Sequence, residues 1–289
     1  MPEGPEVTVV KEDLDNYLSG FYLTKMNIYP TSRYRDKAPD NYLFAEKSLP
    51  LKLESVKSKG KLIYWVFQKN ITLLNTLGMS GIWTLKDYTH TSICLEFSLK
   101  NKKRKVYFVD QRHFGTLKFL NSQKDLDSKL KNIGPDILND KTISLQEYKK
   151  RLLKYKHYNI TKALMEQKII SGVGNYLKSE ILYDAKISPL IKIEDLSEEE
   201  LKKLFNSSKK IINRSYMNKG VSIKDFKDVE GKKGKHQFKL QVYCRDKDKF
   251  ISSKTTDTNS MKRFHFVPDD SYINPLSKAY RDFMNGLKQ

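Results

Sequence analysis

The chain has 289 residues, which is long enough to bury a substantial core and to form two domains. Lys and Arg number 54 against 34 Asp and Glu, a formal charge of +20 that is spread along the sequence. This charge favours a nucleic-acid partner, whose phosphates release counterions on binding, over a generically basic soluble protein. Two cysteines, Cys94 and Cys244, exclude a disulfide framework and a cysteine-rich zinc site. With no bilayer-length apolar run and no signal peptide, we expect an intracellular protein.

The first half of the chain predicts one helix followed by many short strands. Pro5 suits the first turn of a helix, and apolar residues then recur at helical spacing at Val7, Val10, Leu14 and Leu18. Beyond residue 22, short β-type runs alternate with polar turns such as 68–70. The clearest runs are 62–67, 93–97, 106–109 and 115–119. Such a pattern indicates an antiparallel β-sandwich over residues 1–125.

The second half predicts helices and then a hairpin. A polar linker over residues 126–143 precedes a helical domain at 144–225, where Ser144 with Glu147 and Ser197 with Glu200 read as capping boxes. Strand character returns at 226–274, with runs at 237–243 and 264–267 around a lysine-rich segment, and a tail follows at 275–289. The fold class is therefore α+β, in two domains.

The amino terminus carries a candidate nucleophile. If Met1 is removed, Pro2 presents a secondary amine beside the carboxylate of Glu3. Such an amine can attack a sugar carbon and form an iminium without a cofactor. The positive end of the following helix disfavours protonation of the amine and favours ionised Glu3. The alternative is that these residues only start a helix.

Further motifs follow in a fixed order along nearly the whole chain. They are Pro2-Glu3-Gly4-Pro5-Glu6, Ser58-Lys59-Gly60-Lys61, Leu77-Gly78-Met79-Ser80-Gly81, Asp110-Gln111-Arg112-His113-Phe114-Gly115, Ile133-Gly134-Pro135-Asp136, Met165-Glu166-Gln167-Lys168, Gly172-Val173-Gly174-Asn175-Tyr176 and Ser179-Glu180. In these motifs the chain resembles the Fpg/Nei DNA glycosylases, the formamidopyrimidine-DNA glycosylase and endonuclease VIII family. The last three motifs resemble its helix–two-turn–helix.

The resemblance implies a bifunctional DNA glycosylase and AP lyase of base excision repair. Pro2 would attack C1′ of a nucleotide flipped out of the duplex, expel the base, and promote β,δ-elimination of both phosphates. Glu3 would shuttle protons, and Lys61 would bind a phosphate or sugar oxygen. Glu6 would orient the amine or merely cap the helix. In so lysine-rich a chain, the alternative for Lys61 is a surface lysine.

Two further groups would bind DNA. Met79, Arg112 and Phe114 match the residues that fill the void left by the flipped base. Without the family context, Met79 and Phe114 would more often be core residues. Asn175 would donate to a phosphate that the loop glycines Gly172 and Gly174 let approach closely. The alternative is an ordinary helix junction.

The chain departs from relatives that end in a zinc finger. The four ligand positions hold Phe250, Ser253, Val267 and Asp270, none of which supplies a thiolate. We therefore expect a zincless-finger β-hairpin with no metal and no cofactor. The arginine that grips phosphates in that finger corresponds to Arg263 or, by spacing, to Lys262; the forked guanidinium favours Arg263.

Within the family, the sequence leans towards endonuclease VIII-like members. Gly4, the Gly60-Lys61 pair and a short segment at 217–226 support this lean, which implies excision of oxidised pyrimidines and hydantoins. The expected partner is damaged DNA, double-stranded and also single-stranded, bound by a monomer. One alternative is a catalytically silent paralogue that binds damaged DNA, and a more remote one is an RNA- or ribosome-binding protein.

Overall fold

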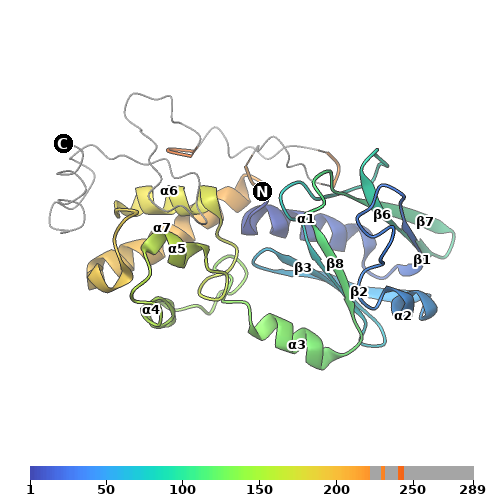
Figure 1. Cartoon of the computed structure of the whole chain (residues 1–289), viewed down its shortest axis with the longest axis horizontal. Helices are drawn as coiled ribbons and strands as arrows, with labels where there is room; N and C mark the ends of the chain where they lie inside the picture. The colour runs from blue at the N-terminus through green and yellow to red at the C-terminus, as the bar shows by residue number, and fades with distance from the viewer. Residues whose placement is uncertain (222–228, 232–239, 244–289) are drawn as a thin grey trace. The chain divides into compact units, whose positions relative to one another are not determined.

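The computed structural model describes residues 1–221, 229–231 and 240–243 (Figure 1). The chain divides into two compact units: residues 1–133 with 215–237, and residues 134–214 with 238–289. Among the described residues, no helix is long and apolar enough to cross a membrane. The α+β organisation predicted from the sequence is confirmed, with strands in the first unit and helices in the second.

The first unit is built on an eight-stranded sheet whose neighbours all pair antiparallel, in the order β5-β7-β6-β1-β2-β3-β4-β8. The strands are β1 Tyr22–Ile28, β2 Leu51–Lys59, β3 Leu62–Phe67, β4 Thr72–Thr76, β5 Ile82–Thr84, β6 Thr91–Leu99, β7 Lys102–Val109 and β8 Thr116–Leu120. The predicted turn at 68–70 joins β3 to β4, and both Lys69 and Asn70 adopt positive φ there.

Two four-stranded halves of this sheet enclose the core. They meet where β1 pairs with β2, at Tyr22 with Lys52 and Leu23 with Leu51. Trp65 on β3 and Trp83 on β5 meet across the interior, with ring centroids 4.8 Å apart. Such packing of two sheet halves through their inner faces is that of a β-sandwich.

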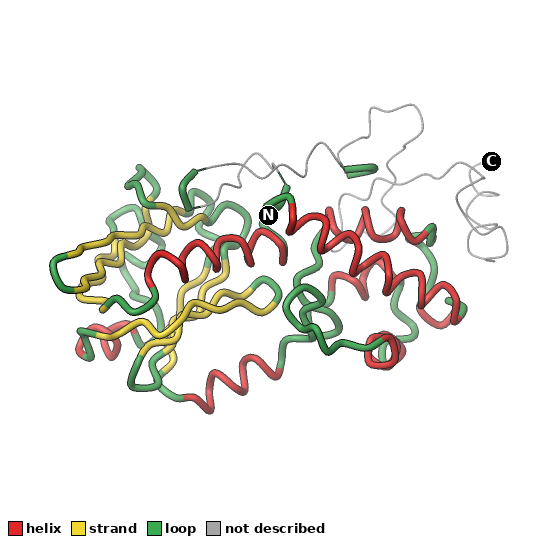
Figure 2. The backbone as a smooth tube through the Cα atoms, turned by 180° about the vertical axis from the view of Figure 1, so that it is seen from behind, coloured by secondary structure: helices red, strands yellow, loops and turns green. Residues whose placement is uncertain are grey.

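Helix α1, Gly4–Leu18, packs against β2 and β3 (Figure 2). The four apolar residues predicted to form its inner face are all buried in the sandwich core: Val7, Val10, Leu14 and Leu18. Two shorter helices complete the unit, α2 Tyr42–Lys47 and α3 Gln123–Lys131. Helix α3 occupies part of the segment that the sequence analysis treated as linker. Ser122 caps it by accepting the N–H of Asp125, a start signal hidden in a polar stretch.

The second unit is helical. Its elements are α4 Leu145–Leu153, α5 Ile160–Met165, α6 Asn175–Ala185, a 3₁₀ turn at Ile193–Asp195 and α7 Glu198–Met217, of which residues 215–217 belong to the first unit. Both predicted capping boxes mark helix starts. The Ser144 hydroxyl accepts the N–H of Glu147 at 3.2 Å, and the Ser197 hydroxyl accepts that of Glu200 at 3.2 Å. The domain boundaries drawn from the sequence remain predictions.

Residues 240–243 differ from the predicted strand at 237–243. They form a bend in which the N–H groups of Gln241, Val242 and Tyr243 all donate to the carboxylate of Glu180, at 2.8, 2.9 and 2.9 Å. Consecutive N–H groups that converge on one anion require a curved backbone, whereas a strand would point them alternately to its two edges. Apart from residues 229–231, the rest of the predicted hairpin lies outside the described residues.

Candidate functional site

The front end of α1 is fixed by a capping box between Glu3 and Glu6. Glu3 is the N-cap residue; its N–H donates to Oε2 of Glu6 at 2.8 Å, and its side chain accepts the backbone N–H of Glu6. Both glutamates are buried. The helix predicted to start here is therefore present, and the same bonds fix the main chain directly after Pro2.

Glu6 also holds a segment far along the sequence. Its Oε1 accepts the backbone N–H of Val221 at 2.8 Å. The neighbouring Gly220 has φ +81, and a Cβ there would lie 2.6 Å from the Glu6 side chain. The close approach therefore requires glycine. One buried carboxylate thus ties the chain that leaves α7 to the main chain of Glu3.

Lys61 lies in the two-residue turn that joins β2 to β3. Lys59 pairs with Leu62 across this turn, and Gly60 before Lys61 has φ +58, as two-residue hairpins favour. Burial lowers the pKa of the Lys61 ammonium, while the charges of Glu3 and Glu6 act in the opposite direction. Within the described part of the chain this ammonium makes no hydrogen bond or salt bridge. The Lys61 side chain is half-buried and lies within range of the charges of Glu3 and Glu6, so it is not a fully exposed surface lysine.

Pro2 directly precedes Glu3 in the chain. It is buried, whereas Met1 is exposed. In the full-length chain the Pro2 nitrogen belongs to the peptide bond with Met1, so it can act as a nucleophile only after Met1 is removed. The first unit therefore brings together Glu3, Glu6 and Lys61 next to the predicted nucleophile.

Two loops of the first unit, 77–81 and 110–115, are bonded to one another. The buried carboxylate of Asp110 accepts the Ser80 hydroxyl at 2.8 Å and the Gly115 N–H at 2.6 Å. The Arg112 N–H donates to the Ser80 hydroxyl at 3.1 Å. At Gly78, which has φ +61, a Cβ would lie 2.6 Å from the backbone of Phe114. The two loops therefore form one rigid platform.

This platform presents the three residues predicted to fill the void. Met79 is 40% exposed and Phe114 is 57% exposed, although large apolar side chains favour burial. The Arg112 side chain is exposed as well. The core interpretation of Met79 and Phe114 is therefore wrong, and the platform offers a flexible apolar chain, an aromatic ring and a guanidinium to a partner.

In the second unit, a loop at 166–174 connects α5 to α6. Gln167 closes it: its amide donates to the carbonyls of Met165 and Val173 at 2.9 Å, and its Oε1 accepts the Gly172 N–H at 2.9 Å. Gly172 has φ +92, a value that suits glycine. Gly174 is the N-cap residue of α6 and carries no side chain that could cap it.

Asn175 is the first residue of α6 and is half-buried. Its Oδ1 accepts the ammonium of Lys178 at 3.1 Å, and among the described residues its amide Nδ2 makes no hydrogen bond. Lys178 is fully buried, and the sequence analysis missed it. The sequence signal that could have found Lys178 is its position three residues after Asn175, since residues three apart on a helix are neighbours. Lys178 fixes which end of the Asn175 amide can donate.

The finger residues Arg263 and Lys262 lie outside the described residues, as do the four positions that replace zinc ligands. In the described ranges, 1–221, 229–231 and 240–243, no three His, Cys, Asp or Glu side chains form a group able to hold a metal ion. The structure describes three groups of candidate residues: the amino-terminal cluster and the platform in the first unit, and the loop before α6 in the second.

Comparisons with known proteins agree with these motifs. The family model for the formamidopyrimidine-DNA glycosylase N-terminal domain matches residues 1–117, and that for the H2TH domain matches residues 133–227. A formamidopyrimidine-DNA glycosylase from Rickettsia bellii is 30% identical over 287 residues, covering 96% of this chain and 100% of its own. One from Listeria monocytogenes is 29% identical, covering 84% and 88%.

Solved structures share the fold. The MutM (Fpg) protein from Thermus thermophilus superposes with a TM-score of 0.79 at 24% identity, over 92% of this chain and 97% of that one. A complex between Lactococcus lactis Fpg and DNA containing an abasic site gives a TM-score of 0.77 at 25% identity, over 92% and 98%. The chain belongs to the formamidopyrimidine-DNA glycosylase family and is a DNA-repair glycosylase.

Proposed function

We propose that this glycosylase is bifunctional, with Pro2 as the nucleophile for both base excision and strand cleavage. The freed Pro2 nitrogen attacks C1′, the bond to the base breaks, and the departing base takes up a proton. The resulting iminium accepts electrons when the 2′ proton is lost, so the 3′ phosphate leaves. A second elimination releases the 5′ phosphate, and hydrolysis frees the proline.

The observation that carries this proposal is the state of Lys61. Lys61 is half-buried, desolvation lowers the pKa of its ammonium, and this ammonium makes no hydrogen bond among the described residues, so a ligand can bind it without displacing an internal partner. A DNA phosphate or sugar oxygen would be such a ligand. The positive charge would then stabilise negative charge that develops as the base and phosphates leave. Glu3, whose charge acts on the same ammonium, is the group placed to move protons.

The other groups fit the same substrate. In the proposal, Met79, Arg112 and Phe114 fill the space that a flipped nucleotide leaves, and the exposure of Met79 and Phe114 supports this role. Asn175 donates its amide to a backbone phosphate, with its orientation fixed by Lys178. A fully buried lysine at this point also adds positive charge where the phosphate would bind.

We further propose oxidised pyrimidines and hydantoins as the favoured lesions, in double-stranded and single-stranded DNA. The support is that the residues at Gly4 and at Gly60-Lys61 resemble those of endonuclease VIII-like members, together with the short segment at 217–226. Structural neighbours give a specific alternative, because Lactococcus lactis Fpg was solved with DNA containing N7-benzyl-Fapy-dG. The alternative lesion class is therefore formamidopyrimidines and oxidised guanine.

An incision panel tests the proposal. Purified full-length protein is given thymine glycol, a hydantoin, 8-oxoguanine and an abasic site, each in single and double strands, with end-group analysis and borohydride trapping. We expect faster release of the pyrimidine and hydantoin lesions, phosphate at both ends of the gap, and a trapped adduct. Binding without incision or adduct would instead favour the catalytically silent paralogue.

A further inference from the structure

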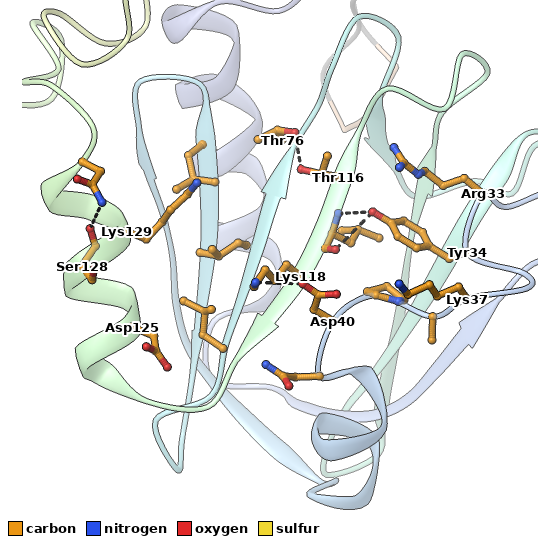
Figure 3. A pocket seen from close by; sticks show the side chains of 18 residues that line it. Arg33, Tyr34, Lys37, Asp40, Thr76, Thr116, Lys118, Asp125, Ser128 and Lys129 are labelled. Atoms are coloured by element: carbon orange, nitrogen blue, oxygen red, sulfur yellow. Dashed lines mark hydrogen bonds and ion pairs between the residues drawn. The ribbon is translucent and has the colours of Figure 1, made fainter.

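The loop between β1 and α2 reaches the platform formed by loops 77–81 and 110–115. Residues of this loop, together with β4, β8 and α3, line an open cavity of about 800 Å³ in the first unit (Figure 3). Arg33 and Tyr34 occupy one end of the cavity, near Thr116. The sequence analysis assigned no role to either residue.

Arg33 contacts the platform through main-chain atoms. Its Nη1 donates to the carbonyl of His113 at 2.9 Å and, more weakly, to that of Gly115 at 3.4 Å. These two carbonyls belong to the residues on either side of Phe114. A single guanidinium nitrogen carries two hydrogens, so it can bond both carbonyls at once.

The backbone conformation of His113 is energetically unfavourable unless other contacts stabilise it. His113 adopts φ +56, a left-handed conformation that residues other than glycine rarely take and that surrounding contacts have to stabilise. Asp110 and Ser80 hold the loop from one side by way of Gly115 and Arg112. Arg33 is the contact that restrains the carbonyl of His113 itself.

Tyr34 fixes the position of the loop that carries Arg33. The Leu117 N–H donates to the Tyr34 hydroxyl at 2.7 Å, which joins the loop to the start of β8. The Arg33 guanidinium lies 5.4 Å from the centroid of the Tyr34 ring, within the range of a cation–π contact. The guanidinium is therefore anchored by an aromatic ring while it bonds the platform.

We propose that Arg33 is a positioning residue that holds Phe114 in its wedge orientation for insertion into duplex DNA. The proposal rests on the void-filling role given to Phe114 above. Arg33 acts through the backbone on both sides of the ring, so its loss would let residues 113–115 relax without removing any group that contacts the sugar. The effect would therefore concern duplex substrates, in which a base step has to be opened.

The test compares Arg33→Met and Arg33→Lys with a matched control, Arg35→Met. Arg35 lies two residues further on, is exposed, and pairs with Asp36. The first measurement is lesion excision from duplex and from single-stranded DNA of the same sequence. The second is the fluorescence of an adenine analogue placed beside a stable abasic analogue in a duplex, which increases when a wedge unstacks it.

We expect Arg33→Met to lower duplex excision about ten-fold, the usual effect of losing a charged hydrogen bond, and to reduce the fluorescence increase. Excision from single strands and borohydride trapping should stay at wild-type levels. Arg33→Lys keeps the charge without the planar fork, so we expect partial rescue, about three-fold below wild type. Arg35→Met should behave as wild type throughout.

Equal losses on duplex and single strands, or an unchanged fluorescence signal, would overturn the role of Arg33. So would an Arg33→Met enzyme with full duplex activity. Failure of the proposed function has a different signature. Wild-type protein would then give no trapped adduct with an abasic site, whatever residue stands at position 33.

Discussion

Each unit contains a buried glutamate that holds a distant segment and a lysine that accompanies it, but the two lysines differ in their hydrogen bonds. In the first unit the buried carboxylate of Glu6 ties Val221 to the main chain of Glu3, and in the second the buried carboxylate of Glu180 ties residues 241–243 to α6. A lysine accompanies each. Lys178 is bonded to Asn175, whereas Lys61 makes no hydrogen bond in the described part of the chain.

We relate this difference to two tasks: DNA binding by Asn175 and Lys178 in the second unit, and the chemical step at Lys61 in the first. The second unit satisfies its buried lysine internally, and the bond leaves a preorganised amide donor on Asn175. The first unit keeps the cost of a desolvated ammonium, since the lowered pKa of Lys61 means that burial outweighs the attraction of Glu3 and Glu6. Such a cost is tolerated where a substrate later supplies the missing partner.

The largest expected effect is that of Lys61→Met. It removes the charge that would stabilise the leaving groups, so we expect base release at saturating DNA to fall about one hundred-fold or more. DNA affinity should fall far less, because the other basic groups remain. Lys57→Met, at an exposed position on β2 just before the turn that holds Lys61, is the control. Single-turnover kinetics with separate binding titrations would distinguish a catalytic Lys61 from one that only binds.

Replacing the buried carboxylates of Glu6 and Glu180 by amides compares the roles of the two units in the reaction and in DNA binding. Glu6→Gln removes one acceptor of the bonds that place Glu3 and Val221, so we expect the single-turnover rate to fall about ten-fold. Glu180→Gln should leave that rate nearly unchanged at saturating DNA and instead weaken DNA binding. The measurement is the rate as a function of DNA concentration. A rate loss for Glu180→Gln that matches the loss for Glu6→Gln would contradict the assignment of Glu180 to DNA binding alone.

Lys178→Met tests the binding side directly. Without the ammonium, the Asn175 amide is no longer held in one orientation, and a charge near the phosphate is lost. We expect the dissociation constant for lesion DNA to rise about ten-fold, with an unchanged rate at saturation. The plot of log affinity against log salt should also become less steep. Lys186→Met, at the exposed C-terminal cap position of α6, serves as control.

The smallest expected effect is a gain in stability. The lowered pKa means that protonated Lys61 opposes folding at neutral pH, so Lys61→Met should raise the melting temperature slightly. As the pH rises, Lys61 loses its proton in the folded state before an ordinary lysine would, and the gain should shrink. Calorimetry from neutral to alkaline pH measures this difference. A variant less stable than wild type at neutral pH would contradict the electrostatic account of Lys61.

Much of the architecture could be read from sequence patterns. Helical spacing placed Val7, Val10, Leu14 and Leu18 in the core, and short β-type runs located four of the eight described strands, β3, β6, β7 and β8. Local motifs also identified the loops that carry Met79 and Phe114. These features depend on neighbours in sequence, which is why pattern analysis finds them.

Contacts between distant residues could not be read in this way. No local pattern joins Glu6 to Val221, Glu180 to residues 241–243, or Arg33 to the carbonyl of His113. The surroundings of Lys61 were equally hidden, because no local pattern shows that the fold brings Glu3 and Glu6 near this lysine. Charges that act through space need the tertiary structure.

The most direct test of the account is to map the covalent adduct. Active protein is reacted with abasic DNA and reduced with borohydride, then digested and analysed by mass spectrometry. The account predicts a sugar remnant on the peptide that begins at Pro2, with Met1 absent. A remnant on Lys61 or another lysine, or full activity in protein that retains Met1, would contradict it.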